Sequence, residues 1–201
     1  MYCSYLTDSN YHSNKSRGGW SGEIVLRMIA LICLSGISAC ATIDQVSDAQ
    51  ALLEPKSGSS VSGTVKLSRL SSGVLLVVDV GGLQPNHMHG FHVHEKGDCS
   101  APDAASAGGH FNPEHTLHGS PMTDSNAHHL GDLPALKSDL QGHAFARITL
   151  PTGSLDPANA HNLLGRSLVV HRDLDDYISQ PAGNSGPRVA CGVILNGVNN
   201  N

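Results

Sequence analysis

The most informative feature of this 201-residue sequence is its 13 histidines, because histidine is the commonest metal ligand in proteins. His92 and His94 are separated by one residue. Side chains two positions apart on a β-strand point to the same face, so both imidazoles can reach one ion. Imidazole suits zinc, copper, iron and nickel alike, so this pair predicts a metal site without naming the metal.

A second group of histidines lies in residues 108–133, GGHFNPEHTLHGSPMTDSNAHHLGDL, where glycines and prolines allow a loop to fold around an ion. Spacing alone does not exclude His115 or His128 as ligands. The stretch holds three imidazoles and one carboxylate that can complete a tetrahedral zinc set: His110, His118, His129 and Asp132.

One more histidine, His171, ends the apolar run SLVVH and precedes an acidic turn that contains Asp173, Asp175 and Asp176. A histidine at the end of a strand is more often structural than functional. His171 becomes a candidate ligand only in combination with the other histidines.

These residues must be positioned by β-structure, because no segment of the main body shows a sustained helical period. About eight short strands predict an all-β fold, an eight-stranded Greek-key β-barrel or sandwich. Two stretches, 96–132 and 172–188, are too long and irregular to be strands and predict functional loops. The candidate strands are residues 61–70, 74–80, 88–95, 133–138, 144–150, 167–171 and 189–194.

The N-terminal segment is typical of an export signal. A ten-residue apolar run, 28–37, follows Arg27 and is too short to cross a bilayer as a helix, as expected for a signal peptide. Its end, Ile-Ser-Ala-Cys40, resembles a bacterial lipoprotein signal in which Cys40 is acylated; the alternative is an ordinary signal cut beside it. We predict a leader and signal peptide over 1–39, of which residues 1–24 are expected to lie upstream of the true translation start. The lipidated cysteine and a tether are predicted over 40–48, and one domain over 49–201.

Composition narrows the possible partners. Twelve Lys+Arg against 17 Asp+Glu give a net charge of −5, so no nucleic-acid partner is expected. The main body contains two of the five cysteines, Cys99 and Cys191. Two cysteines in an exported domain are typical of one disulfide.

Five motifs in this order resemble the signature of the copper/zinc superoxide dismutases. The resemblance covers about residues 49–195, and the run 175–181, DDYISQP, is similar to the bacterial cell-envelope branch. The motifs are GFHVHE (90–95), GHFNP (109–113), HLGDL (129–133), VVH (169–171), and GNSG (183–186) leading into RVACGVI (188–194).

This resemblance implies copper and zinc as cofactors, with His110 bridging the two ions. It also implies that Asp175 ties a copper ligand to a zinc ligand, that Cys99 pairs with Cys191, and that Arg188 lies at the copper channel. The implied copper ligands are His92, His94, His110 and His171, and the implied zinc ligands are His110, His118, His129 and Asp132.

One departure concerns Pro187, which stands where the family usually has a small or polar residue. Proline restricts the residue before it, so we expect Gly186 to be pushed toward extended geometry. This expectation puts the position of Arg188 in question.

The activity implied by the resemblance is disproportionation of superoxide. Copper must cycle between oxidation states because zinc is redox-inert, while His110 supplies a proton and Arg188 attracts the anion. The expected location is the periplasm, with membrane contact only through a lipid anchor at Cys40, as a monomer or homodimer. The alternatives are a non-catalytic envelope protein that binds copper and zinc, and a zinc-only hydrolase, against which the closed four-ligand zinc set argues.

Overall fold

Alternation of apolar and polar side chains builds the strands of this chain. In β3 (Val74–Gly81), every second residue from Val74 onward is buried. β3 pairs antiparallel with β2 (Ser62–Arg69) through a short link in which Gly73 has a φ of +97°. The left-handed conformation there is readily accessible to glycine. The candidate strands 61–70 and 74–80 therefore form a β-hairpin.

The computed structural model describes residues 47–123 and 128–197. The predicted leader, the signal peptide and Cys40 lie outside the described residues. The other elements are β1 (Ala49–Pro55), β4 (Met88–His89), β5 (Phe91–His94), the 3₁₀-helix η1 (Ala105–Ala107), β6 (Leu136–Lys137), β7 (Ala144–Leu150), β8 (Ser167–His171), β9 (Arg188–Val193) and β10 (Leu195–Asn196).

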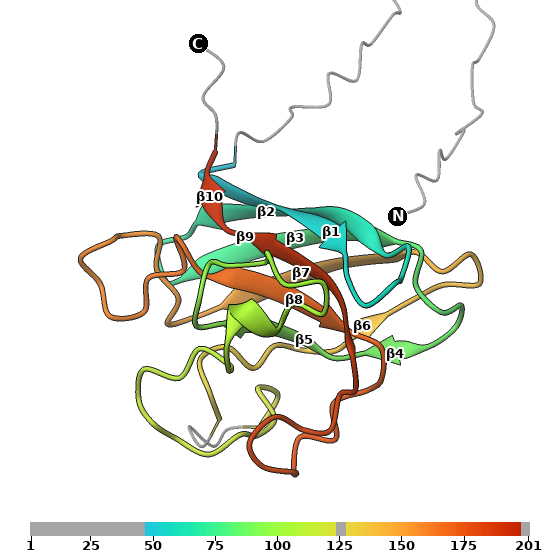
Figure 1. The fold of residues 1–201 in the computed structure, drawn as a ribbon. Helices are drawn as coiled ribbons and strands as arrows, with labels where there is room; N and C mark the ends of the chain where they lie inside the picture. Colours follow the sequence, from blue (N-terminus) through green and yellow to red (C-terminus); the bar gives the residue numbers. More distant parts are fainter. Residues whose placement is uncertain (1–46, 124–127, 198–201) are drawn as a thin grey trace, which may run out of the picture. The chain divides into compact units, whose positions relative to one another are not determined.

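Within the described ranges, eight strands form one antiparallel sheet that curls into a half-barrel (Figure 1). The strand order is β5-β8-β9-β1-β2-β3-β7, with β10 paired to β1, and β4 and β6 form a separate two-stranded ladder. The all-β prediction with eight strands is thereby confirmed. Buried side chains of several strands, including Leu67, Leu76, Val78, Phe91 and Leu168, form the core.

The predicted strand over 88–95 is divided in two. The chain changes partner at Gly90: β4 pairs with β6, whereas β5 pairs with β8. Gly90 N donates to Asp173 O at 2.8 Å, and a Cβ at this position would lie 2.7 Å from Ser185 Oγ. The close approach of the loop after β8 therefore divides the strand and requires a glycine.

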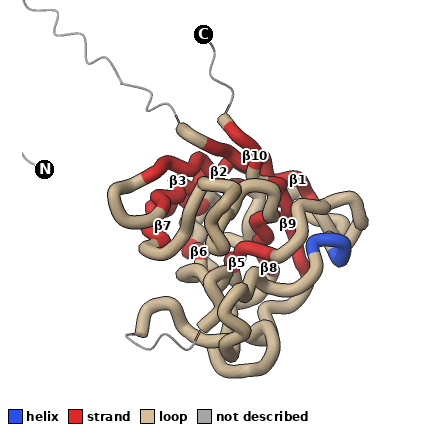
Figure 2. The backbone as a smooth tube through the Cα atoms, turned by 90° about the vertical axis from the view of Figure 1, so that its left-hand side faces the viewer, coloured by secondary structure: helices blue, strands red, loops and turns tan. Residues whose placement is uncertain are grey.

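The two long loops meet although they leave the sheet at opposite ends. β5 and β8 are antiparallel neighbours, so the loop after β5 and the loop after β8 begin at opposite ends of this strand pair. The first loop runs back along β5, where His110 and Asp132 form isolated bridges with His94 and His92. Both loops lie on the same side of the sheet (Figures 1 and 2). Side-chain contacts across 57 residues, such as His118 Nε2 to Asp175 Oδ1 at 2.9 Å, join the two loops. The histidine-rich segment therefore faces the acidic turn after β8.

The predicted disulfide between Cys99 and Cys191 is present and ties the first loop to β9. The bond spans 92 residues of sequence. In the entropic model, closing a loop of that length stabilises the fold by about 4–5 kcal/mol.

We expect the double variant Cys99→Ser, Cys191→Ser to lose about 4 kcal/mol of unfolding free energy, because the unfolded chain is no longer constrained. Urea unfolding of the metal-loaded protein measures this loss, with the wild-type protein in the absence and presence of reductant as the reference. A loss below about 1 kcal/mol would mean that the disulfide serves the geometry of the loop rather than its stability.

Candidate metal centre

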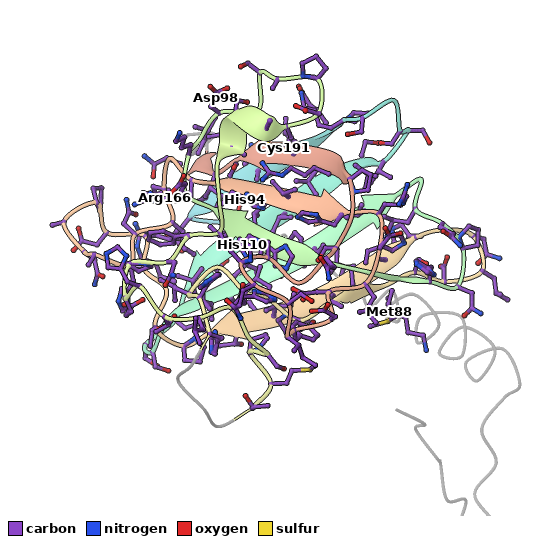
Figure 3. The ribbon with its side chains drawn as sticks, turned by 60° about the horizontal axis from the view of Figure 1, so that its bottom comes forward. Met88, His94, Asp98, His110, Arg166 and Cys191 are labelled. Atoms are coloured by element: carbon purple, nitrogen blue, oxygen red, sulfur yellow. A yellow bond between two sulfur atoms is a disulfide. The ribbon has the colours of Figure 1, made fainter. Side chains whose placement is uncertain are left out.

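β5 presents two histidines to a common site, as the spacing predicts. His92 and His94 are buried, at 0% and 1% exposure, and their ring centroids are 6.2 Å apart. The neighbouring strand β8 ends in His171, whose ring centroid lies 4.9 Å from that of His92. His110 pairs with His94 through an isolated β-bridge, and its ring stacks on His92 at 4.0 Å. Figure 3 shows His94 and His110 close together beside the strands.

Besides His110, this group contains His92, His94 and His171, and one ring nitrogen of each of these three has a hydrogen-bond partner. His94 Nδ1 donates to Gly108 O at 3.0 Å, and His171 Nδ1 donates to Gly186 O at 3.2 Å. His92 Nε2 lies 2.6 Å from a carboxylate oxygen of Asp175. These contacts fix the ring orientations and leave the other nitrogen of each ring directed at the site.

The remaining nitrogens are buried without a partner: His92 Nδ1, His94 Nε2, His110 Nε2 and His171 Nε2. An orphaned buried polar atom destabilises a fold by about 1–3 kcal/mol, so a bound partner is expected. Burial, together with neighbouring histidines, lowers the pKa of His171 to about 3. Burial also lowers the pKa of His110 to about 4, despite an opposing hydrogen bond to Asp132. Neutral imidazoles with free lone pairs fit a copper ion.

The second group converges on one carboxylate oxygen. Asp132 Oδ1 lies 2.8 Å from His110 Nδ1, 3.0 Å from His118 Nδ1 and 3.4 Å from His129 Nδ1. Burial opposes ionisation of Asp132, but hydrogen bonds from these three rings outweigh it and hold its pKa far below the usual range. Three imidazole nitrogens and one carboxylate fit a tetrahedral zinc ion.

The structure settles which loop histidines belong to this group. His115 is exposed, and half-buried His128 directs its Nδ1 to the carbonyl of His129 at 2.7 Å. Neither has its ligand atom with the others, whereas His118 and His129 do. The alternatives left open by spacing are thereby excluded for the described conformation.

His110 belongs to both groups. Its Nδ1 faces Asp132, and its Nε2 is one of the four unpartnered nitrogens. The ligand atoms of each group lie within 4.8 Å of one another. One imidazole therefore lies between a copper-type site of four histidines and a zinc-type site of three histidines and one aspartate.

Asp175 forms a second link between the two groups. Its side chain is buried, with Oδ2 at 2.6 Å from His92 Nε2 and Oδ1 at 2.9 Å from His118 Nε2. Burial opposes ionisation, but hydrogen bonds from His118 and His92 outweigh it and lower the pKa of Asp175 well below its usual range. A carboxylate in this position orients both rings and raises their basicity.

Arg188 at the start of β9 is held by two backbone carbonyls. Its Nη1 donates to Ala104 O and its Nη2 to Gly108 O, both at 2.7 Å. Burial is the largest cause of the lowered pKa of His94, and the neighbouring His110 is the next. The positive charge of Arg188 lowers this pKa further. The guanidinium is therefore fixed near the copper-type group.

Our expectation for Gly186 was wrong. Its φ is +72°, in the left-handed region rather than extended, because a residue without Cβ can relieve the clash with the following proline in this way. Pro187 O accepts a hydrogen bond from Arg172 N at 2.9 Å. The junction is thus ordered by contacts that do not need a Pro187 N–H.

Sequence reasoning missed the backbone acceptors around the site. The carbonyl of Gly108 binds both His94 and Arg188. A Cβ at Gly108 would lie 2.4 Å from Glu95 Oε1, and its φ is +75°. The glycine itself was the available signal, but carbonyl partners are decided by the path of the chain.

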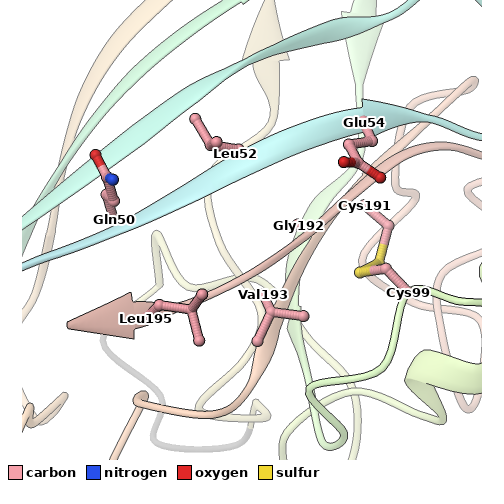
Figure 4. A pocket seen from close by; sticks show the side chains of 8 residues that line it. All are labelled: Gln50, Leu52, Glu54, Cys99, Cys191, Gly192, Val193 and Leu195. Atoms are coloured by element: carbon pink, nitrogen blue, oxygen red, sulfur yellow. A yellow bond between two sulfur atoms is a disulfide. The ribbon is translucent and has the colours of Figure 1, made fainter. Parts of the chain in front are cut away.

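Two cavities differ in their relation to the histidines. One of about 280 Å³ lies along β1, β9 and β10 beside the disulfide (Figure 4), lined by Gln50, Leu52, Glu54, Cys99, Cys191, Gly192, Val193 and Leu195. The other, of about 340 Å³, borders the bridging histidine and is lined by Glu95, Gly109, His110, Asn112, His115, His129, Pro181 and Ala182. The second cavity borders two candidate metal ligands, His110 and His129, whereas the first borders none.

Comparisons with known proteins agree with this geometry. The sequence model of the copper/zinc superoxide dismutases (SODC) matches residues 61–194. Superoxide dismutase [Cu-Zn] 2 of Aquifex aeolicus is 40% identical over 137 residues, which cover 67% of this chain and 79% of the relative. The Caulobacter vibrioides superoxide dismutase [Cu-Zn] is 42% identical over 138 residues, 66% of this chain and 78% of that one.

A solved structure shows the same fold. The crystal structure of a superoxide dismutase-like protein from Bacillus subtilis superposes with a TM-score of 0.65 at 36% sequence identity. The match covers 73% of this chain and 97% of that chain.

Proposed function

Because this chain belongs to the copper/zinc superoxide dismutase family, we propose that it disproportionates superoxide in a bacterial cell envelope, with His110 and Arg188 as its catalytic residues. The observation that carries the proposal is the complete pair of ligand groups that share His110. One superoxide is oxidised to oxygen, and a second takes up that electron and two protons to give hydrogen peroxide.

When bound, copper supplies a centre that accepts and returns one electron, and zinc supplies a fixed positive charge. His110 can hold a proton at Nε2, which is buried and has no other partner, while Nδ1 faces the zinc-type group. Release of that proton to the reduced substrate, with a second proton from water, completes hydrogen peroxide. A buried donor at a defined position makes this transfer efficient.

Arg188 is proposed to attract and orient the anion. The overall charge of −5 repels superoxide, so a local positive group is needed to focus it. The two carbonyls that hold the guanidinium limit its motion and keep the charge at one place.

The substitution Arg188→Ala is expected to lower the rate of superoxide consumption about tenfold at low salt, at the lower end of electrostatic steering effects. Copper and zinc content should not change, since Arg188 is in neither ligand group. Pulse radiolysis at several ionic strengths measures the rate. Arg172→Ala, which removes an exposed guanidinium paired with Asp173, is the matched control. Equal rates for wild type and Arg188→Ala at low salt would remove Arg188 from the mechanism.

The alternative is a copper- and zinc-binding envelope protein without turnover. Superoxide decay, followed with metal content on the same sample of purified exported protein, separates the two. Fast decay at one copper and one zinc per chain supports the enzyme. Full loading with decay at the background rate would leave a binding protein.

Export is supported by the disulfide and by likeness to a relative named extracellular superoxide dismutase [Cu-Zn] of Haemonchus contortus. In the part of the chain that the structure describes, no helix is long and apolar enough to cross a membrane. We further propose lipid anchoring at Cys40, which the motif before it supports.

The substitution Cys40→Ser is expected to move the protein from the membrane fraction to the soluble periplasmic fraction, because the acyl chains would be lost. Fractionation with labelled palmitate measures both the location and the lipid. Retention in the membrane fraction without label would exclude this anchor.

A further inference from the structure

We propose that Tyr177 and Gln180 are positioning residues for the zinc-site ligand His118. Residues 175–183 contact His118 at its backbone, at one face of its ring and at Nε2, the ring nitrogen that faces away from the zinc-type group. The inference deepens the proposed function: it rests on the zinc-type site but not on turnover. His118 lies in a loop, outside the strands of the sheet, so another segment has to hold it in place.

Gln180 grips the backbone. His118 N donates to Gln180 Oε1 at 2.9 Å, and Gln180 Nε2 donates to His118 O at 2.9 Å. One primary amide thus pairs with both backbone groups of one residue, as a neighbouring strand would. This pairing needs one acceptor and one donor on the same side chain, which Gln supplies and Glu in its ionised form does not.

Tyr177 covers the ring. The Tyr177 and His118 rings are nearly parallel, at 11°, with centroids 6.5 Å apart. Its hydroxyl accepts a hydrogen bond from Ala135 N at 2.9 Å, which anchors the far end of the side chain. Its own N–H donates to Asp175 Oδ1 at 2.7 Å.

The backbone of Tyr177 is held in a strained conformation. Its φ is +56°, an unfavourable conformation for a residue with a Cβ. Such strain costs on the order of 1–2 kcal/mol and persists only where surrounding contacts impose it. Here the conformation lets the N–H reach Asp175 while the ring lies along His118.

The third contact acts on the ring nitrogen that faces away from Asp132. Asp175 Oδ1 binds His118 Nε2 at 2.9 Å, and Gly183 closes over this pair. A Cβ at position 183 would lie 1.8 Å from Asp175 Oδ1 and 2.7 Å from His118 Nε2. With its backbone, ring face and outer nitrogen all held, His118 can direct its Nδ1 only at the zinc-type group.

This arrangement predicts a loss that is specific to zinc. Removing outer contacts of a metal ligand typically lowers metal affinity 10–100-fold. We therefore expect Gln180→Ala to weaken zinc binding at least tenfold and to leave copper binding unchanged, because Gln180 touches none of the four copper-type histidines. Gln180→Glu keeps the size of the side chain but loses the N–H donor, and we expect its zinc affinity to fall as far as that of Gln180→Ala. Tyr177→Phe, which keeps the ring and loses the hydroxyl anchor, should show a smaller loss.

The experiment measures zinc and copper affinities separately on the full chain by competition with chromophoric chelators. Cobalt(II) alone is the probe for geometry, because its visible absorption reports the coordination of the zinc-type site. Asn184→Ala is the matched control: Asn184 lies in the same loop, and among the described residues its side-chain amide donates to Asp176 and Ser179 and to no zinc-type ligand.

The expected result is weaker zinc binding and an altered cobalt spectrum in Gln180→Ala and Gln180→Glu, with wild-type behaviour in Asn184→Ala. Wild-type zinc affinity and cobalt spectrum in Gln180→Ala would overturn the inference. Equal losses in Asn184→Ala, or parallel losses of zinc and copper, would also overturn it by showing general damage to the loop. Zinc affinities that split as expected in a protein without superoxide consumption would reject the proposed enzyme and retain this inference.

Discussion

Replacing His171 with alanine is expected to abolish superoxide consumption and to lower copper affinity on the order of 10³-fold, equivalent to about 4 kcal/mol at 1.4 kcal/mol per tenfold. His171 is the single ligand that β8 contributes, and Gly186 O holds its Nδ1 so that Nε2 faces the other three nitrogens. Alanine leaves three imidazoles and an opening that water can enter.

The measurement pairs pulse radiolysis with copper and zinc content on one sample. Zinc should stay bound, because His171 does not belong to the Asp132 group. His143→Ala is the matched control: that histidine is paired with Asp79 at the surface, away from both groups. A His171→Ala protein that consumes superoxide at the wild-type rate would contradict the assignment of copper to this group.

Replacing Asp132 with asparagine is expected to remove zinc and to destabilise the metal-free protein by about 3–5 kcal/mol, the usual effect of breaking a buried charge pair. Asp132 is completely buried and also accepts backbone hydrogen bonds from His129 N at 2.8 Å and Gly119 N at 3.2 Å. In asparagine an amide N–H group replaces one carboxylate oxygen, so a donor would face the N–H donors that now bind that oxygen. The closely packed histidines would also lose their shared negative charge.

The stability difference should be largest at intermediate pH. The folded-state pKa of Asp132 lies far below its unfolded value of about 3.9, so its contribution is fully present above that value and declines as pH falls below it. Burial lowers the pKa of His118, but hydrogen bonds to Asp132 and Asp175 outweigh it and raise that pKa to about 9, so the contribution of the His118 charge is lost as pH rises from about 6.5 through 9. Urea unfolding of metal-free wild type and Asp132→Asn should therefore give a gap that is widest between about pH 5 and 6.5 and that narrows toward both pH 2 and pH 9.

Asp79→Asn provides the matched control for this prediction. Asp79 Oδ1 also lies 2.6 Å from a histidine nitrogen, that of His143, but both side chains are exposed. Exposed pairs contribute little to stability, so this variant should match wild type at every pH. A stability loss in Asp79→Asn as large as in Asp132→Asn would show that burial is not the cause.

The sequence by itself determined the features that depend on neighbouring residues. The period of two along a strand places His92 and His94 on one side of β5, and the apolar run before His171 forms β8. The hairpin of β2 and β3 follows from alternation and a glycine turn. The strand β1 was missed because its alanines, though completely buried, carry little β signal.

Only the tertiary structure decided the features that join distant parts of the chain. The loop after β5 runs back along its own strand, where His110 and Asp132 form bridges with His94 and His92, and so meets the loop after β8. This packing places Asp175 between His92 and His118, from positions 83 and 57 residues away. Spacing along the chain carries no record of such distances, so it left His115 and His128 open as ligands. The carbonyls that hold Arg188 were equally invisible, because backbone groups are the same in every residue and only the folded path selects them. The role of the Gln180 side-chain amide was invisible for the same reason, since its partners are the backbone N–H and C=O of His118, 62 residues away.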